Sequence, residues 1–249
     1  MIDYQQKMNP AILEIAPSGI RKFFDIANEM QDVISLSIGE PDFVTPWHVR
    51  QEGIRSLEDG KTWYSPNRGF SELRNELSAW FHRHYGVEYN PDKELLITVG
   101  GSEAIDLCFR TLLAPGDEVL VPQPSFVCYG PLASMAGGVP VYIETKAENC
   151  FRLTPEEIEE KITPRTKILV LPFPNNPTGA VMRRADLEAV AEVVKKHDLF
   201  VLSDEIYSEL TYGGTPHVCF ASIDGMRERT VVVNGFSKAF AMTGWRLGY

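Results

Sequence analysis

Polar side chains that could do chemistry follow four short apolar runs of this sequence. They are a serine after two glycines, an amide, a carboxylate and an amine, at Ser102, Asn176, Asp204 and Lys238. Taken alone, each has an ordinary explanation: a helix cap, a turn, a second cap and a solvated lysine. Their recurrence after successive apolar runs indicates a single ligand that carries a phosphate, a ring cation and a carbonyl group.

The chemistry of each group supports that interpretation. Glycines that run into a helix start favour an anion such as phosphate, although GxGxxG is absent and "GGSEA" is weak by itself. A carboxylate such as Asp204, directly after an apolar strand, is costly to bury unless it is paired or caps a helix. A lysine amine forms a Schiff base with an aldehyde. Pyridoxal phosphate carries all the groups required.

An alternation of short apolar runs with helical-period segments predicts the elements that position these groups. The predicted strands are 95–99, 118–122, 139–144, 167–172, 199–203 and 230–234. Helices are predicted over 102–114, with Ser102 as the N-cap, and over 184–197. The pattern is typical of an α/β fold with a mostly parallel, doubly covered sheet, in which ligands bind at the carboxyl ends of the strands.

Composition and charge exclude several classes of protein. With 24 basic and 34 acidic residues the net charge is -10, and the basic residues are scattered, so nucleic acid and anionic membranes are not expected partners. The four cysteines lack metal-ligand spacing, and the opening residues lack a signal segment. We expect a soluble, cytoplasmic protein with no metal site. Residues 1–45 are predicted to form an amino-terminal arm and the start of a small-domain region, and 46–249 a large cofactor-binding domain.

The stretch from Gly235 through Gly248, "GFSKAFAMTGWRLG", resembles the lysine attachment signature of the class I/II pyridoxal-phosphate aminotransferases, which have the aspartate-aminotransferase-like fold. "SIGEPDF", "YSPNRG", "VGGSEA", "NNPTG" and "SDEIY" stand in the order that this family has. The resemblance covers essentially all 249 residues. It implies a cytoplasmic enzyme of amino acid metabolism that moves an amino group between an L-amino acid and a 2-oxo acid.

The resemblance also implies roles for particular residues. Lys238 would hold the cofactor as a Schiff base and shuttle protons, Asp204 would bond the ring nitrogen, and Asn176 and Tyr207 would hydrogen-bond the ring hydroxyl. Phe126 would stack on the ring, although a core aromatic is an alternative for it. Phosphate contacts are implied for Gly101, Ser102, Ser237 and Arg246. Tyr64 would reach the phosphate of a neighbouring subunit, which implies a homodimer with shared sites, and Gly39 would contact the substrate.

Members of this family continue into a smaller carboxyl-terminal domain that carries an arginine for the substrate carboxylate. We therefore expect this chain to be carboxyl-terminally truncated, with that domain missing. Aromatic amino acids, aspartate or related amino acids are the expected substrates. A carbon–sulfur lyase with the same cofactor and a catalytically inert fragment remain alternatives. A cofactor-sensing transcription regulator is disfavoured, because the chain starts without a basic DNA-binding module.

Overall fold

The structure is a computed structural model that describes residues 2–15, 26, 30, 34 and 39–249. Much of the predicted amino-terminal arm therefore lies outside the described residues, and the division at residue 45 stays a prediction. The helices are α1 (Pro10–Leu13), α3 (Trp47–Glu58), α4 (Ser71–Tyr85), α5 (Gly101–Leu112), α6 (Tyr129–Met135), α7 (Pro155–Glu159) and α8 (Arg184–Lys196). The strands are β1 (Glu118–Gln123), β2 (Val139–Glu144), β3 (Thr166–Leu171), β4 (Phe200–Asp204) and β5 (Thr230–Val233). No described helix is both long and apolar enough to span a membrane.

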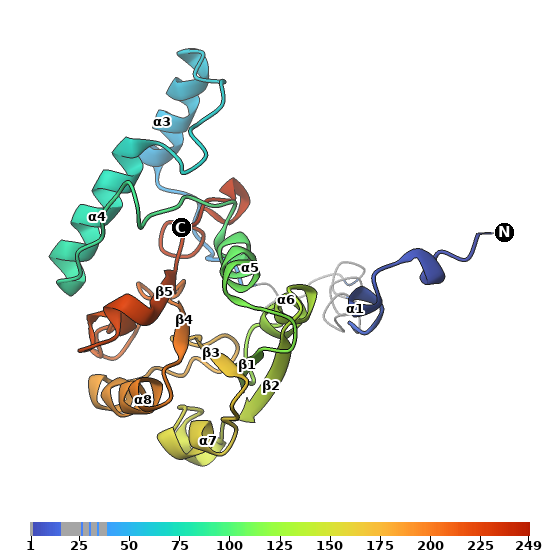
Figure 1. Ribbon diagram of the computed structural model, residues 1–249. Coiled ribbons are helices and arrows are strands. Elements are labelled where there is room, and N and C mark those ends of the chain that lie inside the picture. The colour runs from blue at the N-terminus through green and yellow to red at the C-terminus, as the bar shows by residue number, and fades with distance from the viewer. Residues whose placement is uncertain (1, 16–25, 27–29, 31–33, 35–38) are drawn as a thin grey trace.

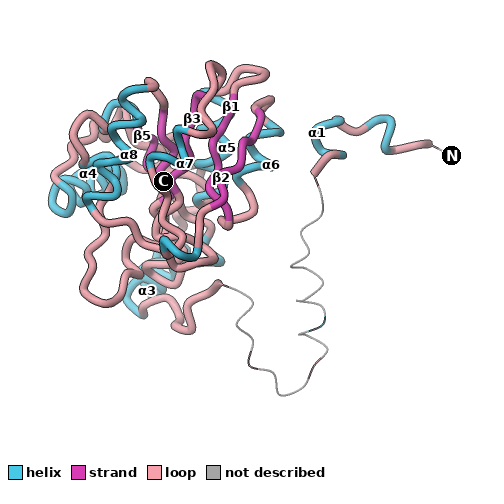
Figure 2. Tube along the Cα trace, turned by 90° about the horizontal axis from the view of Figure 1, so that it is seen from below, coloured by secondary structure: helices cyan, strands magenta, loops and turns pink. Residues whose placement is uncertain are grey.

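The strands form one parallel sheet in the order β2-β1-β3-β4-β5. Figure 1 shows the five strands in this order, and Figure 2 shows the carboxyl terminus close to β5. Alternate side chains of each strand point to opposite faces, so the apolar strands build two core layers. α7 and α8 pack on one layer, and α5 and α6 pack on the other (Figure 1). The expected doubly covered α/β sheet is confirmed.

Two local predictions need correction. The run 95–99 forms a single antiparallel bridge, from Thr98 to Gly248, rather than a strand. Its other backbone bond, from the Ile97 amide to the Arg68 carbonyl, does not extend that bridge into a ladder. Gly248 also bridges Gly235 on its other side, so the last residues lie between segments that are far apart in sequence. Ser102 is not the N-cap of α5. Gly100 takes that place with φ 84°, a conformation that glycine adopts without strain, so the N-cap lies two residues earlier than predicted.

Candidate active site

A pocket of about 370 Å³ opens at the carboxyl ends of the strands. Its size falls within the range of small-molecule sites. The loop after β1 leads to α6 on one face of the sheet, whereas the loop after β3 leads to α8 on the opposite face. The two loops diverge and leave a crevice, as expected where the winding of an open parallel sheet reverses. Phe126 and Asn176 line this crevice from its two sides.

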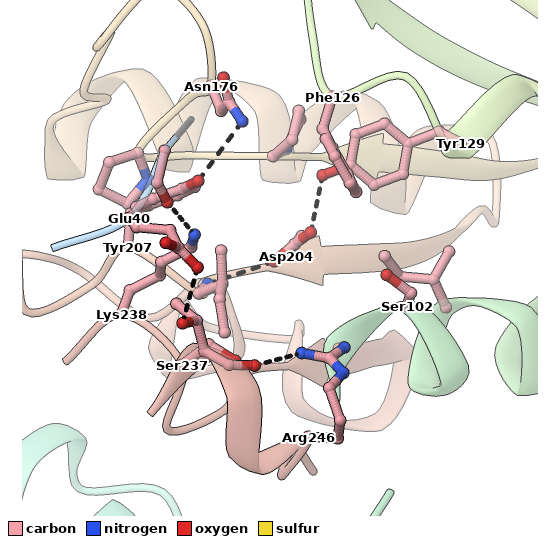
Figure 3. Close-up of a pocket in the computed structure, with 17 residues that line it drawn as sticks. Glu40, Ser102, Phe126, Tyr129, Asn176, Asp204, Tyr207, Ser237, Lys238 and Arg246 are labelled. Carbon is pink, nitrogen blue, oxygen red and sulfur yellow. Dashed lines mark hydrogen bonds between the residues drawn. The ribbon is translucent and has the colours of Figure 1, made fainter. Parts of the chain in front are cut away.

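Asp204, the last residue of β4, is the buried acid of the pocket. Its Oδ2 accepts a hydrogen bond from the Tyr129 hydroxyl at 2.7 Å, and its Oδ1 accepts one from the Ile206 amide at 3.2 Å (Figure 3). Burial raises the pKa of Asp204, the two hydrogen bonds oppose this rise, and neighbouring Glu205 adds to it. No described lysine, arginine or histidine lies within ion-pair distance of Asp204. The carboxylate is therefore suited to a cation supplied by a ligand.

Lys238 lines the same pocket as Asp204 and is half-buried. Its Nζ donates a hydrogen bond to the Gly39 carbonyl, and it lies 5.7 Å from the centre of the Tyr207 ring. Burial lowers the pKa of the Lys238 amine, the Glu40 carboxylate raises it, and Arg246 lowers it. A lowered pKa makes more of the amine available as the uncharged nucleophile near neutral pH.

Asn176 and Tyr207 meet at the side of the pocket. The Asn176 amide nitrogen lies 3.4 Å from the Tyr207 hydroxyl, to which it donates. Burial raises the pKa of Tyr207, the Asp204 charge raises it further, and the Asn176 amide lowers it. The phenol therefore stays protonated at neutral pH. The pair presents an amide and a hydroxyl, both of which can donate to an oxygen in the pocket.

An anion-binding end lies at the start of α5. Gly101 and Ser102 line the pocket at the amino terminus of this helix, where unpaired N–H groups and the helix dipole favour negative charge. Arg246 lines the same end and has no carboxylate partner among the described residues. A Cβ at Gly100 would overlap its guanidinium, so glycine there lets the arginine approach the helix start. Ser237 is buried and lines the pocket as well.

The remaining predicted site residues lie in different surroundings. Phe126 lines the pocket and is 39% exposed, with its ring edge-on to Tyr129 at 6.1 Å, so it is not a core aromatic. Gly39 lines the pocket through its backbone. Tyr64 does not line this pocket, and its side chain is fully exposed. Its predicted contact with a second subunit stays a prediction.

Tyr129 and Glu40 are among the pocket residues that were not predicted from the sequence. Tyr129 holds Asp204, but it looks like a helix residue of the core in the sequence, and its spacing of three from Phe126 was the only available signal. Glu40 lines the pocket and accepts a hydrogen bond from the Thr243 hydroxyl at 2.9 Å. Because its partner is 203 residues away, no local pattern could have linked the two.

The donor set fits pyridoxal phosphate. Asp204 has no cationic partner among residues 2–15 and 39–249, and the start of α5 and Arg246 suit a phosphate. Lys238 offers an amine, and Phe126 presents an apolar ring. A buried carboxylate with no described cationic partner is unfavourable by itself and becomes favourable when a ligand cation pairs with it.

Comparison with known proteins gives the same picture. The family model of aminotransferase class I and II matches residues 31–249. A putative aminotransferase of Bacillus subtilis is 50% identical over 238 residues, which cover 96% of this chain and 61% of the relative. Aromatic-amino-acid aminotransferase 2 of Thermococcus litoralis is 48% identical, with 94% of this chain and 60% of the relative covered.

A similar solved structure is that of aspartate aminotransferase from Thermus thermophilus with maleate. It superimposes with a TM-score of 0.90 at 42% identity and covers 97% of this chain and 63% of that one. The present chain thus spans about 60% of the length of the relatives it matches. Through its sequence, its parallel sheet and its pocket, the chain belongs to the class I and II aminotransferase family.

Proposed function

We propose that the protein acts as a pyridoxal-phosphate-dependent aminotransferase, moving an amino group between an L-amino acid and a 2-oxo acid. The observation that carries the proposal is that an amine, a buried carboxylate and an anion-binding end line one pocket of suitable size. Enzymes of this family use pyridoxal phosphate. When bound, this cofactor supplies an electron sink that stabilises negative charge at the substrate Cα.

Residues of the chain would hold the cofactor at three places. Lys238 would bind it covalently through Nζ, which the lowered pKa of the amine favours. Asp204 would pair with the protonated ring nitrogen, with Tyr129 keeping the carboxylate oriented. Arg246 and the start of α5, with Ser102 and Ser237, would hold the phosphate.

Other residues would orient the ring and move protons. Asn176 and Tyr207 would donate to the ring hydroxyl oxygen, and Phe126 would cover one ring face. Nζ of Lys238, once released, would carry a proton to and from the substrate Cα, because it stands in the pocket as a base of lowered pKa. Gly39 would contact the substrate. The relatives named for aromatic amino acids and aspartate support one of these substrates for the whole protein.

The whole protein is proposed to be a homodimer. Tyr64 is fully exposed, and Trp63, next to it in the sequence, is 66% exposed. Such a gathering of exposed aromatic side chains is typical of a protein interface. Sedimentation of the wild type and of Tyr64→Ala tests this: the wild type should sediment as a dimer, with a weaker dimer in the variant.

The test of the cofactor site is reduction with borohydride in the presence of pyridoxal phosphate, followed by peptide mass mapping. The expected result is a pyridoxyl group confined to Lys238. Lys238→Ala serves as the control and should lose that label while keeping a cooperative unfolding transition. A label spread evenly over surface lysines, or none at all, would contradict the proposal. Amino transfer to a 2-oxo acid, rather than release of pyruvate and ammonia, would then separate an aminotransferase from a lyase.

A further inference from the structure

The segment 39–45 lies against the loop 238–246, which carries both Lys238 and Arg246. Four hydrogen bonds join them, each across about 200 residues of sequence. They run from Lys238 Nζ to the Gly39 carbonyl, from Thr243 to the Glu40 carboxylate at 2.9 Å, from Thr45 to the Ala241 carbonyl at 2.6 Å, and from Trp245 Nε1 to the Thr45 hydroxyl at 3.2 Å.

Thr45 makes two of these four bonds through one hydroxyl group. It is 6% exposed, and its Oγ1 donates to Ala241 while accepting from Trp245. Its donor and one acceptor position are therefore both used. Threonine just before a helix commonly caps that helix, but α3 begins at Trp47 without any side-chain cap bond. The hydroxyl is directed at the distant loop instead.

The backbone of the loop 238–246 is strained at two residues, so contacts from another segment are needed to hold its conformation. Ala241 and Arg246 have φ values of 50° and 52°, a conformation that costs a non-glycine residue about 1–2 kcal/mol. Such residues persist where the surrounding structure holds them. The Thr45 hydroxyl is hydrogen-bonded to the carbonyl of Ala241 and to the side chain of Trp245, the residue before Arg246. The ring of Trp245 also rests on α3, where a Cβ at Gly53 would lie 2.9 Å from it.

We propose that Thr45 is a positioning residue for Arg246. From outside the pocket, its hydroxyl holds both ends of the turn 241–245 and thereby sets where the guanidinium stands at the anion end. Thr45 does not line the pocket, so it acts on a ligand only through the loop. The inference rests on the proposed function, because the anion concerned is the phosphate of the cofactor.

The test compares two ligands that differ only in the phosphate. Dissociation constants of pyridoxal phosphate and of pyridoxal are measured by absorbance titration of the cofactor-free chain for the wild type, Thr45→Val and Thr45→Ser. Thr45→Val should weaken the binding of pyridoxal phosphate about tenfold, which is the scale of one lost hydrogen bond. The binding of pyridoxal should weaken less than about twofold. Thr45→Ser keeps the hydroxyl and should restore the wild-type preference for the phosphate.

Thr145→Val is the matched control. Thr145 is 9% exposed and also donates its hydroxyl to a backbone carbonyl, that of Gln123 at 2.8 Å, but it has no contact with the loop 238–246. Its substitution should leave the ratio of the two constants unchanged. If Thr45→Val weakens the binding of both ligands equally, or of neither, the assignment is overturned. A merely structural role would not distinguish pyridoxal phosphate from pyridoxal.

Hydrogen exchange separates this inference from the proposed function. The Met242 amide donates to the Ser237 carbonyl, and the Trp245 amide donates to the Met242 carbonyl. In the cofactor-free chain they should exchange about tenfold faster in Thr45→Val than in the wild type or Thr45→Ser. If the wild type fails to prefer pyridoxal phosphate and Lys238 stays unlabelled, the proposed function fails. The exchange rates then decide alone: unchanged rates in Thr45→Val overturn the role of Thr45.

Discussion

Asp204 and Glu205 are adjacent, buried carboxylates with very different surroundings. Asp204 faces α6 and, within the part of the chain that the structure describes, accepts hydrogen bonds from Tyr129 and Ile206 alone. Glu205 faces the segment between β4 and β5. Its Oε1 accepts from the Ser203 hydroxyl at 2.8 Å and from an amide at 3.0 Å, and its Oε2 meets His217 at 2.7 Å.

The difference shows that burial alone does not mark a functional acid. Glu205 has hydrogen-bond partners from this chain at both carboxylate oxygens, namely Ser203, His217 and a backbone amide, so its hydrogen bonds are complete without a ligand. Asp204 opens on a pocket and has no described cationic partner. A buried carboxylate without a cationic partner destabilises the protein when no ligand is bound. Pairing with the cation of a ligand therefore stabilises it strongly.

The largest expected effect comes from Glu205→Ala. Removing this carboxylate leaves Ser203, His217 and an amide without their partner, and breaking such a buried pair costs about 3–5 kcal/mol of unfolding free energy. Chemical denaturation of the cofactor-free chain measures the loss. Glu205→Gln keeps the shape and one acceptor and should lose less. If Glu205→Ala unfolds at the same denaturant concentration as the wild type, the structural role is wrong.

Asp204→Asn should act in the opposite direction. The folded pKa of Asp204 is raised above its unfolded value, so the protonated form stabilises the fold at low pH and this contribution is lost as pH rises through the folded pKa. At pH 8 the amide should therefore stabilise the cofactor-free chain, by about 1–3 kcal/mol, and the gain should vanish in acid. Denaturation of both proteins across pH measures this. A destabilised variant at pH 8 would contradict the comparison.

A smaller effect is expected for Tyr129→Phe. The lost hydroxyl removes one hydrogen bond that favours the charged form of Asp204, so unfolding free energy at pH 8 should fall by about 1 kcal/mol. The loss should shrink at low pH, where the carboxyl is protonated. Phe126→Leu, which changes an exposed ring of the same pocket, is the control and should show no such pH dependence.

The smallest effect concerns the reactivity of Lys238. Burial lowers the pKa of its amine, so its rate of acetylation should reach half-maximum at a lower pH than that of the surface lysines. Competitive labelling with peptide mapping measures all the lysines at once. Glu40→Gln removes a neighbouring negative charge and should move the Lys238 midpoint further down. A midpoint above that of the surface lysines would contradict this.

Local patterns were enough to predict β1 to β5 and α8, because apolar runs and helical periodicity are properties of short segments, but they also predicted a strand at 95–99 that does not form. The residues after the strands could also be identified, since parallel strands bring their carboxyl ends together. The start of α5 was predicted wrongly, because Gly100, with its positive φ, is the N-cap, whereas the local pattern favoured the side chain of Ser102 for that place. Tyr129 and Thr45 were missed because their partners lie 75 and 196 residues away.

The bonds between residues 39–45 and the loop 238–246 also have a consequence for the order of synthesis. Every residue of β1 to β5 leaves the ribosome before Lys238 and Arg246 do. The parallel strands can begin to pair while the chain is still growing, but the pocket needs contacts across about 200 residues. Contacts of such long sequence separation form slowly. Nascent chains are thus expected to pass through a stage in which the sheet is formed and the binding site is not. The cofactor is expected not to bind at that stage.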